Sequence, residues 1–226
     1  MIEIKDLTKK YGDKIVLKNI NLQFNKGKVQ GIVGENGAGK TTLFRCISGL
    51  EKYDGEIKSE LNPLKNYIGL LLTNPYFFTR ITGREYLQLL CNARKIKIED
   101  FEKQNIFNLP LNQYASTYST GMKKKLAITA ILLQKNKVFI LDEPYNGVDI
   151  QSNLIITELI LELKKLNKTL IISSHIFSTL NDTCDEIHLL EKGELIKTVQ
   201  KEDFKKLEEE MKTTAIGNKV KKMNLK

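Results

Sequence analysis

A glycine-rich stretch near the N-terminus constrains the fold of this chain more than any other feature. Residues 34–42 read Gly-Glu-Asn-Gly-Ala-Gly-Lys-Thr-Thr, so two glycines bracket four residues and are followed by Lys40 and Thr41. Glycine lets the backbone turn tightly, and successive N–H groups can then point at phosphate oxygens. Lys40 supplies a positive charge, and the Thr41 hydroxyl can coordinate Mg²⁺. The stretch therefore predicts a loop that cradles the phosphates of a nucleotide.

The residues on either side of this loop have the patterns that such a loop requires. The apolar run 29–33 is typical of a buried strand. Apolar residues then recur at the spacing of one helix face: Leu43, Cys46, Ile47 and Leu50. A strand, a glycine loop and a helix N-terminus thus follow one another, and the unpaired N–H groups and positive dipole end of such a helix attract phosphate.

Length and cysteine content narrow the class of protein. A chain of 226 residues can bury one substantial core, and its apolar runs are all shorter than the ~18 residues that span a membrane. The first residues alternate apolar and polar side chains, which is typical of a strand and not of a signal peptide, so we expect a cytosolic protein. The three widely spaced cysteines indicate neither a disulfide framework nor a metal cluster.

The net charge of +9 arises in part from a lysine-rich C-terminal tail. This charge is not accompanied by the interleaved aromatic and basic residues of a nucleic-acid interface. We therefore expect a solvated basic surface, and we do not expect nucleic acid as a partner.

Strand-like and helix-like segments alternate along most of the sequence, which predicts an α/β fold with a mainly parallel sheet and helices on its faces. The first residues form two alternating segments around a turn at 10–13, which predicts an N-terminal antiparallel β subdomain. Residues 84–94 fit one helix face and 101–109 continue in short helical pieces, which indicates an α-helical insertion. A further helix is predicted over 152–166, with Ser152 as its N-cap.

Two acidic residues follow the apolar run 137–141, which is typical of a buried strand. The Asp142 carboxylate can hold Mg²⁺ from the side opposite Thr41. Glu143 leaves the strand on the other side from Asp142, but at the strand's end its side chain can turn toward a γ-phosphate and polarise an attacking water. We therefore interpret this pair as catalytic and not as a solvated turn.

A second buried-strand pattern at 168–174 is followed by His175. The carboxyl ends of parallel strands meet at one edge of a sheet, and ligands bind in the crevice outside that edge. Gly34, Asp142 and His175 each follow such a strand, so we expect them to lie together in one crevice.

Three segments, in their order and spacing, resemble the motifs of the nucleotide-binding subunits of ABC transporters, from about Met1 to about Lys201. Walker A corresponds to 34–42, and Walker B to the Leu-Asp-Glu-Pro segment at 141–144. The signature corresponds to Tyr-Ser-Thr-Gly-Met at 118–122, followed by a helix that is basic in its first turn. The signature is the discriminating segment, because Walker A is also found in kinases, GTPases and helicases.

The resemblance implies an ATP-hydrolysing subunit with a P-loop NTPase fold and with ATP and Mg²⁺ as cofactors. The nucleotide-binding domain would cover 1–201 with a helical subdomain at about 74–125, and a charged helix and basic tail would follow over 202–226. Glu143 would act as general base or orient the water, and His175 would hold the γ-phosphate and sense its loss. The implied ATP-binding residues are Tyr11, on which adenine would stack, Gly34, Asn36, Gly37, Ala38, Gly39, Lys40, Thr41, Thr42, Ser119, Gly121 and Asp149. The implied Mg²⁺ ligands are Thr41 and Asp142.

The resemblance also implies a head-to-tail dimer, with two ATP molecules between the Walker A motif of one protomer and the signature of the other. Ser119 and Gly121 would contact the γ-phosphate bound to the second protomer, and Asp149 would pass information across the interface. Binding would close the dimer and hydrolysis would open it, in a homodimer or in a heterodimer. A separate polytopic membrane subunit would dock in the groove around 73–118, which would hold this chain on the cytoplasmic face of the membrane.

Two departures from the family pattern affect the interpretation. The signature usually reads Leu-Ser-Gly-Gly-Gln, whereas Tyr118, Thr120 and Met122 stand here at its first, third and fifth positions. This form is similar to subunits of drug, peptide and lantibiotic exporters, and it implies export. Thr73 falls where the family usually has a glutamine that reaches Mg²⁺ and links the site to the membrane subunit, and a threonine is too short to do this in the same way.

Two other classes are the alternatives. A soluble ATPase of the same family could act as a mechanical adaptor in translation, repair or cofactor assembly. Its translation members usually carry two cassettes and its repair members a long coiled coil, and this sequence has neither feature. A phosphoryl-transfer enzyme such as a kinase would share the phosphate loop but not the signature or Glu143. The sequence does not predict the transported substrate, because specificity in this family resides mainly in the membrane chains.

Overall fold

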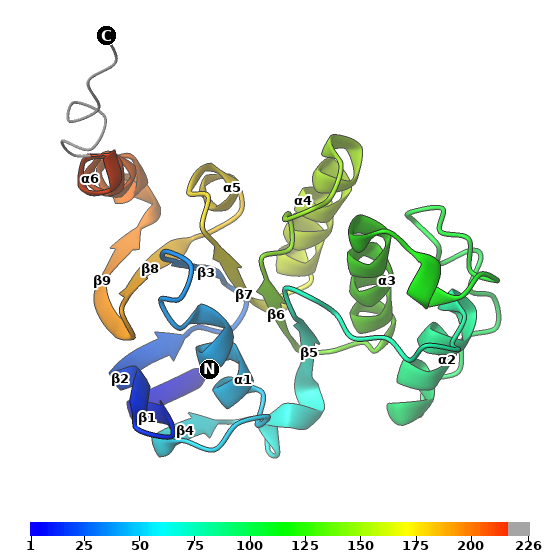
Figure 1. Ribbon diagram of the computed structural model, residues 1–226, viewed down its shortest axis with the longest axis horizontal. Coiled ribbons are helices and arrows are strands. Elements are labelled where there is room, and N and C mark those ends of the chain that lie inside the picture. Colours follow the sequence, from blue (N-terminus) through cyan, green and yellow to red (C-terminus); the bar gives the residue numbers. More distant parts are fainter. Residues whose placement is uncertain (217–226) are drawn as a thin grey trace, which may run out of the picture.

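Two β-sheets form the framework of the computed structural model, which describes residues 1–216 (Figure 1). The first sheet is antiparallel with the order β2-β1-β4, where β1 is Ile2–Tyr11, β2 is Lys14–Phe24 and β4 is Asp54–Ser59. It confirms the predicted N-terminal antiparallel subdomain, to which the chain after the phosphate loop contributes the third strand.

The second sheet has the order β5-β6-β7-β3-β8-β9 and is parallel except for its last pair. Its strands are β3 (Val29–Val33), β5 (Ile68–Leu71), β6 (Val138–Asp142), β7 (Thr169–Ser174), β8 (Glu186–Glu191) and β9 (Glu194–Gln200). This confirms the predicted mainly parallel sheet. Strands β6, β7 and β3 are neighbours, so the residues that follow them meet at one edge.

The helices lie around these sheets. They are α1 (Lys40–Ile47), α2 (Gly83–Ala93), α3 (Thr120–Leu133), α4 (Ile150–Lys165), α5 (Ser178–Asn181) and α6 (Phe204–Ile216), with short 3₁₀ helices η1 (Leu64–Tyr67), η2 (Ala115–Thr117) and η3 (Lys201–Asp203). Helices α2 and α3 pack together on the side of the molecule away from the antiparallel sheet (Figure 1). Within residues 1–216, the structure has no helix that is both long and apolar enough to cross a membrane.

Alternate residues of the central strands pack into two cores on opposite faces of the parallel sheet, as the two-residue period of a strand requires. Val138 and Ile140 of β6 belong to the core beneath the antiparallel sheet and α1. Phe139 and Leu141 belong to the core that includes α3 and α4. All of β6 is therefore buried, which holds the carboxyl end of this strand at a fixed position.

One helix begins earlier than predicted. The helix expected over 152–166 is α4, which begins at Ile150, and its N-cap is Asp149 and not Ser152. The Asp149 carboxylate accepts a hydrogen bond from the Ser152 backbone N–H. Both residue types are favoured N-caps, so the local pattern alone does not decide between them.

The segment 101–109 forms turns, so the prediction of short helical pieces there is wrong. Asp100 accepts a hydrogen bond from the Glu102 backbone, and Asn105 bonds to the backbone N–H and C=O of Leu109. Such bonds between side chains and the local backbone compete with a helical ladder. The apolar residues of the segment, including Phe101, nevertheless reach the core.

The charged helix predicted at the start of the C-terminal tail is α6, whose residues Phe204 and Leu207 are buried. The basic tail predicted beyond it, residues 217–226, lies outside the described residues. The domain boundaries at about 74, 125 and 201 stay predictions.

A buried histidine in β8 makes fold stability depend on pH. His188 is 2% exposed, its Nδ1 lies 2.8 Å from the Thr198 hydroxyl, and its ring packs edge-on against Phe24. Burial lowers the pKa of His188 to about 4, below its ordinary value of about 6.5. The unfolded chain therefore binds the extra proton first, so the contribution of His188 is fully present above pH ~6.5 and is lost as the pH falls toward ~4.

We expect the wild type to lose about 2 kcal/mol more unfolding free energy than His188→Gln between pH 7 and pH 5. Urea unfolding of both proteins at the two pH values measures this difference. Equal losses in the two proteins would contradict a neutral, buried His188.

Candidate functional site

The phosphate loop connects β3 to α1 and depends on glycine at several positions. Gly37 and Gly39 have φ angles of 86° and 111°, in the left-handed region that favours glycine. A Cβ atom on Gly34 would lie 2.2 Å from the backbone oxygen of Leu190, so a side chain does not fit there. Gly39 is the N-cap of α1 and provides no side-chain acceptor, so the N–H groups of the first turn are available to phosphate.

Lys40 is the first residue of α1, and its side chain folds back over the loop. It is 6% exposed, and Nζ donates to the backbone oxygens of Gly34 at 2.7 Å and Glu35 at 3.2 Å. Nζ also lies 3.6 Å from Oε1 of Glu143. The loop's own carbonyls thus hold a positive charge where phosphate oxygens would bind.

Three hydroxyl groups surround the buried carboxylate of Asp142 at the end of β6. Thr41 Oγ1 donates to Asp142 Oδ2 at 2.6 Å, and Ser173 Oγ donates to Oδ1 at 2.6 Å. Thr73 Oγ1 also donates to Oδ2, at 2.7 Å. Thr73 therefore contacts the predicted Mg²⁺ ligand Asp142, although its side chain is shorter than the glutamine that the family usually has at this position. The predicted pair Thr41 and Asp142 is therefore brought together, and two further hydroxyls orient the carboxylate.

Glu143 follows β6 with a φ angle of 52°. A non-glycine residue in this region costs about 1–3 kcal/mol and persists only where its neighbours hold it. Its backbone N–H donates to Ser173 Oγ at 3.0 Å. Its side chain is 9% exposed, and Oε2 lies 2.8 Å from Nδ1 of His175, whereas Oε1 has no hydrogen-bond partner in the described part of the chain. One carboxylate oxygen is therefore buried without a hydrogen-bond partner among the described residues, beside the Lys40 ammonium group.

These residues line one cleft of about 420 Å³. Its lining consists of Lys14, Val16, Asn36, Gly37, Ala38, Gly39, Lys40, Thr41, Thr42, Thr73, Asp142, Glu143, Asn146 and His175. The predicted crevice at the carboxyl ends of β3, β6 and β7 thus exists. Five predicted binding residues lie outside its lining: Tyr11, Gly34, Ser119, Gly121 and Asp149.

The signature segment lies at the N-terminus of α3. Ser119 is exposed and is the N-cap, and its hydroxyl accepts a hydrogen bond from the Met122 backbone N–H. Tyr118 is buried, and its hydroxyl donates to the Pro110 backbone oxygen at 2.7 Å, which accounts for a tyrosine at this core position. A Cβ atom on Gly121 would lie 2.7 Å from the Gly147 backbone oxygen, so Gly121 lets α3 approach the loop after Walker B.

Asp149 connects that loop to the same helix. Its carboxylate accepts hydrogen bonds from the N–H and hydroxyl of Ser152, and Lys125 Nζ lies 3.1 Å from Oδ2. The Ser152 bonds, with the Lys125 ammonium, hold the pKa of Asp149 well below its usual range. The carboxylate is therefore charged throughout the physiological range, and its predicted role across an interface stays a prediction.

Tyr11 lies at the end of β1, next to the turn that leads into β2, and it is 43% exposed. Lys9 Nζ lies 4.5 Å from the centroid of its ring, which fixes one ring face by a cation–π contact. The tyrosine is thus accessible to a flat ligand, but it does not line the phosphate cleft. Adenine stacking on Tyr11 stays a prediction.

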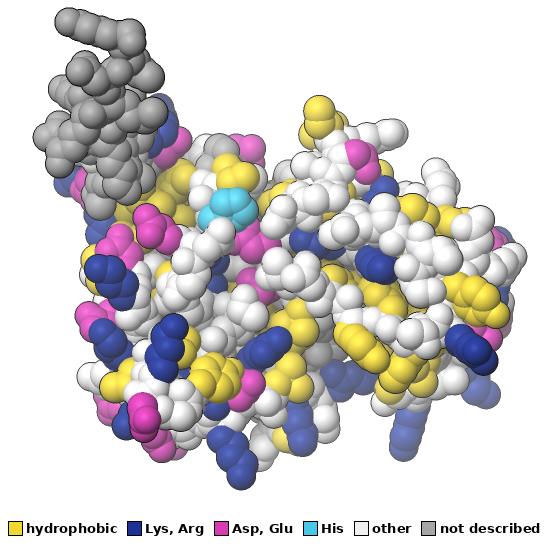
Figure 2. All heavy atoms as spheres, in the orientation of Figure 1, with side chains coloured by type: hydrophobic (Ala, Val, Ile, Leu, Met, Phe, Trp, Pro, Cys, Tyr) yellow, Lys and Arg dark blue, Asp and Glu magenta, His cyan; other side chains and the backbone are white. Residues whose placement is uncertain are grey.

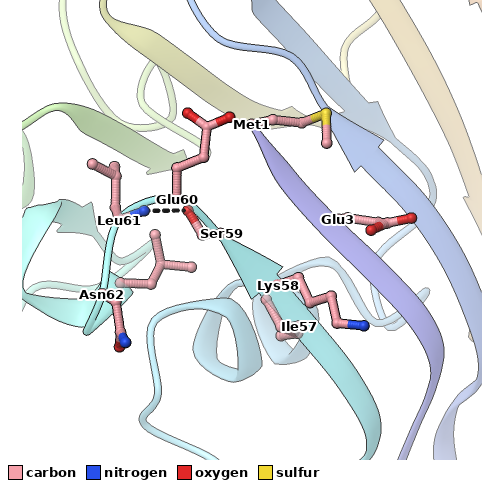
Figure 3. A pocket seen from close by; sticks show the side chains of 9 residues that line it. Met1, Glu3, Ile57, Lys58, Ser59, Glu60, Leu61 and Asn62 are labelled. Atoms are coloured by element: carbon pink, nitrogen blue, oxygen red, sulfur yellow. Dashed lines mark hydrogen bonds between the residues drawn. The ribbon is translucent and has the colours of Figure 1, made fainter.

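A second hollow lies in the antiparallel sheet, along β1, β4 and the chain that follows β4 (Figure 3). Glu3, Lys58 and Glu60 are among the residues that line it, and the Ser59 hydroxyl accepts a hydrogen bond from the Leu61 backbone. It brings together none of the phosphate-binding or water-activating residues named above. The phosphate cleft is therefore the candidate site.

Lys14 and Val16 of the lining were not predicted, and neither were two residues that bond to the backbone or carboxylates of Asp142 and Glu143. Ser173 bonds to both Asp142 and Glu143, and a polar residue within a buried strand could have indicated it. Lys124, in the basic first turn of α3, is buried, and its Nζ donates to the Glu143 and Asn146 backbone oxygens at 2.6 Å and 2.8 Å. Its neighbours Lys123 and Lys125 give the same sequence signal, so no pattern distinguishes it.

Comparison with known proteins identifies relatives of this chain. The family model described as ABC transporter matches residues 17–146. A bacitracin transport ATP-binding protein of Enterococcus faecalis is 34% identical over 215 residues, which are 88% of this chain and 69% of that protein. The ABC transporter ATP-binding protein NatA of Bacillus subtilis is 34% identical over 216 residues, which are 87% of this chain and 88% of that protein.

Solved structures of similar fold confirm the predicted P-loop architecture. The cbiO1 protein from Clostridium perfringens, part of the ABC transporter complex cbiONQ, has a TM-score of 0.73 and 26% identity, with 97% of this chain and 96% of that one covered. A dimeric ATP-binding cassette in a post-hydrolysis state, bound to ADP and Pi, has a TM-score of 0.78 and 23% identity, with 88% and 98% covered.

Proposed function

Because the chain belongs to the ABC transporter family of ATP-binding subunits, we propose that its phosphate cleft binds ATP with Mg²⁺ and that the signature of a second cassette completes the site. The chain is an ATPase that powers a membrane transporter. The observation that carries the proposal is the convergence of the phosphate loop, Asp142, Glu143 and His175 in one cleft from which Ser119 is absent.

The residues around Asp142 fit a magnesium ion. The ion prefers hard oxygen ligands and usually takes only one or two carboxylates, with phosphate oxygens and waters as its other ligands. The Thr41 hydroxyl and the Asp142 carboxylate supply such oxygens. When bound, the ion would neutralise charge that develops on the transferred phosphate.

The side chains of the cleft divide the remaining work. Lys40 binds phosphate, and this competes with the contact that Lys40 makes to Glu143 Oε1. Oε1 is then available to accept a proton from the attacking water, while His175 holds Oε2 and orients the carboxylate. His175, which is partly exposed, can also contact the γ-phosphate and respond to its loss.

A second cassette is needed because Ser119 is exposed and does not reach the cleft of its own chain. Ser119 of one protomer would contact the γ-phosphate held by the other, in a head-to-tail arrangement of two copies or of two related subunits. The helix dipole at the start of α3 favours this anion. Hydrolysis would then remove the contact and open the dimer.

The membrane partner is a separate polytopic subunit, and this chain would lie against its cytoplasmic face. Hydrophobic side chains gather over the helical part of the molecule (Figure 2), and the exposed ones there are Tyr76, Phe78, Leu89, Ile106 and Tyr114. A coupling helix of the partner would cover them in the groove around 73–118. The Tyr-Ser-Thr-Gly-Met signature and a relative named for bacitracin transport support export.

A matched pair of substitutions at Ser119 tests the composite site. Aspartate and asparagine both replace serine as N-cap, so neither should unfold α3. Only aspartate places a negative charge against the γ-phosphate, which we expect to lower turnover roughly 10- to 100-fold relative to Ser119→Asn. ATP binding to the separate chain should stay unchanged, because Ser119 lies outside its cleft.

Turnover per chain, measured against chain concentration, gives the second readout. We expect wild-type turnover per chain to rise with concentration, because two chains form each site. Turnover that is independent of concentration, and equal in the two Ser119 variants, would contradict the composite site.

A further inference from the structure

Lys124 is a buried lysine that takes no part in the proposed steps of ATP binding and hydrolysis. Its side chain is 1% exposed, and no carboxylate lies within ion-pair distance of Nζ among residues 1–216. Nζ donates hydrogen bonds to two backbone oxygens, those of Glu143 at 2.6 Å and Asn146 at 2.8 Å. Nζ therefore spans the turn that begins at the general base.

Burying an ammonium group that has no carboxylate in direct contact is unfavourable. Burial lowers the pKa of Lys124, although the nearby Glu143 and Asp142 carboxylates act in the opposite direction. The lysine is tolerated because two carbonyl oxygens accept its hydrogen bonds. An apolar side chain of similar length would fill the same space without this penalty. The presence of the ammonium group therefore indicates a purpose beyond packing.

The geometry of Glu143 indicates what that purpose is. Glu143 has a φ angle of 52°, a conformation that a non-glycine residue keeps only when its surroundings hold it. Its N–H is bonded to Ser173, and its C=O is bonded to Lys124. Both ends of this strained residue are thus held, so the two bonds act together with the His175 contact to set the direction of its carboxylate.

The same helix carries the signature. Ser119 is the N-cap of α3, five residues before Lys124, and it is exposed. Two other contacts fix the start of α3 on the loop after Walker B: the close approach of Gly121 to Gly147 and the ion pair of Lys125 with Asp149. A movement of Ser119 against the nucleotide of a second protomer would therefore also shift Lys124 and the Glu143 carbonyl to which Lys124 is bonded.

We propose that Lys124 is a positioning residue, which holds Glu143 in its left-handed conformation and joins the signature of this chain to the chain's own hydrolytic site. The inference rests on the proposed function, in which Glu143 activates the water. It predicts that Lys124 affects the chemical step and not ATP binding, and that it acts only through the Glu143 carboxylate.

The first test is the steady-state kinetics of Lys124→Met in the full chain. We expect kcat to fall about 10- to 100-fold, because a displaced general base loses its alignment with the water, while KM and ATP affinity change by less than about threefold. Lys135→Met is the matched control in the turn just after the same helix, where the side chain is exposed, and it should behave as wild type. A kcat for Lys124→Met within twofold of wild type would overturn the proposal.

The second test is a double-mutant cycle with Glu143→Gln, measured as single-turnover hydrolysis. If Lys124 acts through the carboxylate, adding Lys124→Met to Glu143→Gln should lower the residual rate by less than about twofold. An equal fold loss in both backgrounds would overturn the proposal and show a general structural effect. If Glu143→Gln alone keeps wild-type turnover, the proposed function fails and not merely the role of Lys124.

A conservative variant keeps the proposal testable if Lys124→Met does not fold. Lys124→Arg retains a charged donor, and we expect it to fold, to keep wild-type ATP affinity and to recover most of kcat. Lys124→Gln retains an uncharged donor on a shorter side chain and should lie between arginine and methionine. If the kcat values of the three variants instead rank in the order of their melting temperatures, and not in the order of their hydrogen-bond donors, a positioning role is contradicted.

Discussion

Replacing Glu143 by glutamine is expected to lower ATP turnover by about 10²- to 10⁴-fold, the range typical for loss of a general base. The amide keeps the size of the side chain and can still bond to His175, so the cleft should keep its shape. It does not accept a proton from water at neutral pH, so the chemical step is lost. ATP affinity should stay close to wild type, because phosphate is bound by the loop and Lys40.

Measurement of kcat and of ATP dissociation constants in the two proteins separates these effects. Glu158→Gln is a suitable control, because it makes the same chemical change on the exposed face of α4 and should turn over ATP as wild type does. If Glu143→Gln hydrolyses ATP at the wild-type rate, Glu143 is not the general base and the unpaired Oε1 has another purpose.

Replacing Lys40 by methionine is expected to abolish useful ATP binding. Removing one partner of a desolvated charge pair costs about 2–5 kcal/mol, which corresponds to roughly a 30-fold to several-thousand-fold loss of affinity. Lys40 is buried and aligned by two loop carbonyls, so no other cation can take its place without rebuilding the loop. Equilibrium titration with a fluorescent ATP analogue measures the loss.

Lys14→Met is the informative comparison for this prediction. Lys14 lines the same cleft, but its side chain is exposed, so its interaction with phosphate is screened by water. We expect only a few-fold loss of affinity from Lys14→Met. Equal losses in the two variants would show that net charge in the cleft, and not the fixed position of Lys40, determines binding.

The core of the fold and of the site could be predicted because each part depends on a local pattern. A buried strand, a glycine loop and an amphipathic helix follow one another at 29–47, and their order alone generates a phosphate site. Asp142 ends one buried strand and His175 follows another, and a parallel sheet brings the ends of its strands together whatever the loops between them do. Their convergence therefore followed from topology.

The supports of the site could not be predicted, because they arise from contacts between distant segments. Ser173 is a hydroxyl in an otherwise ordinary strand, and Lys124 is one of three consecutive lysines. Only the packing of α3 on the turn after β6 distinguishes Lys124 from its neighbours. The bond of the Thr73 hydroxyl to Asp142 could not be predicted either, because the sequence does not show that these two distant residues lie side by side.

Local competition between hydrogen bonds explains the errors in secondary structure. Asp149 and Ser152 are both suitable N-caps, and the chain uses the first because Ser152 and Lys125 both bond to its carboxylate. In 101–109 the apolar spacing resembles a helix, but Asp100 and Asn105 bond to the backbone around them and favour turns. The spacing of apolar residues gives no information about these hydrogen bonds between polar side chains and the local backbone.

The position of the signature is the feature that most distinguishes this chain from a self-contained phosphoryl-transfer enzyme. Its phosphate loop, carboxylates and histidine form one cleft, whereas Ser119 is exposed and is not among the residues that line that cleft. An enzyme such as a kinase would need no such second element. We therefore propose that the chain supplies half of a site, which a second cassette would complete.

Capture of the membrane partner tests this account most directly. Tagged Glu143→Gln protein, expressed in its native cell and purified from gently solubilised membranes with ATP present, should retain the partner because ATP binds but is not hydrolysed. Tagged Lys40→Met protein is the control that does not bind ATP. The account predicts that mass spectrometry finds a polytopic membrane protein with Glu143→Gln. Recovery instead from the soluble fraction, with ribosomes, nucleic acid or an assembly scaffold, would contradict it.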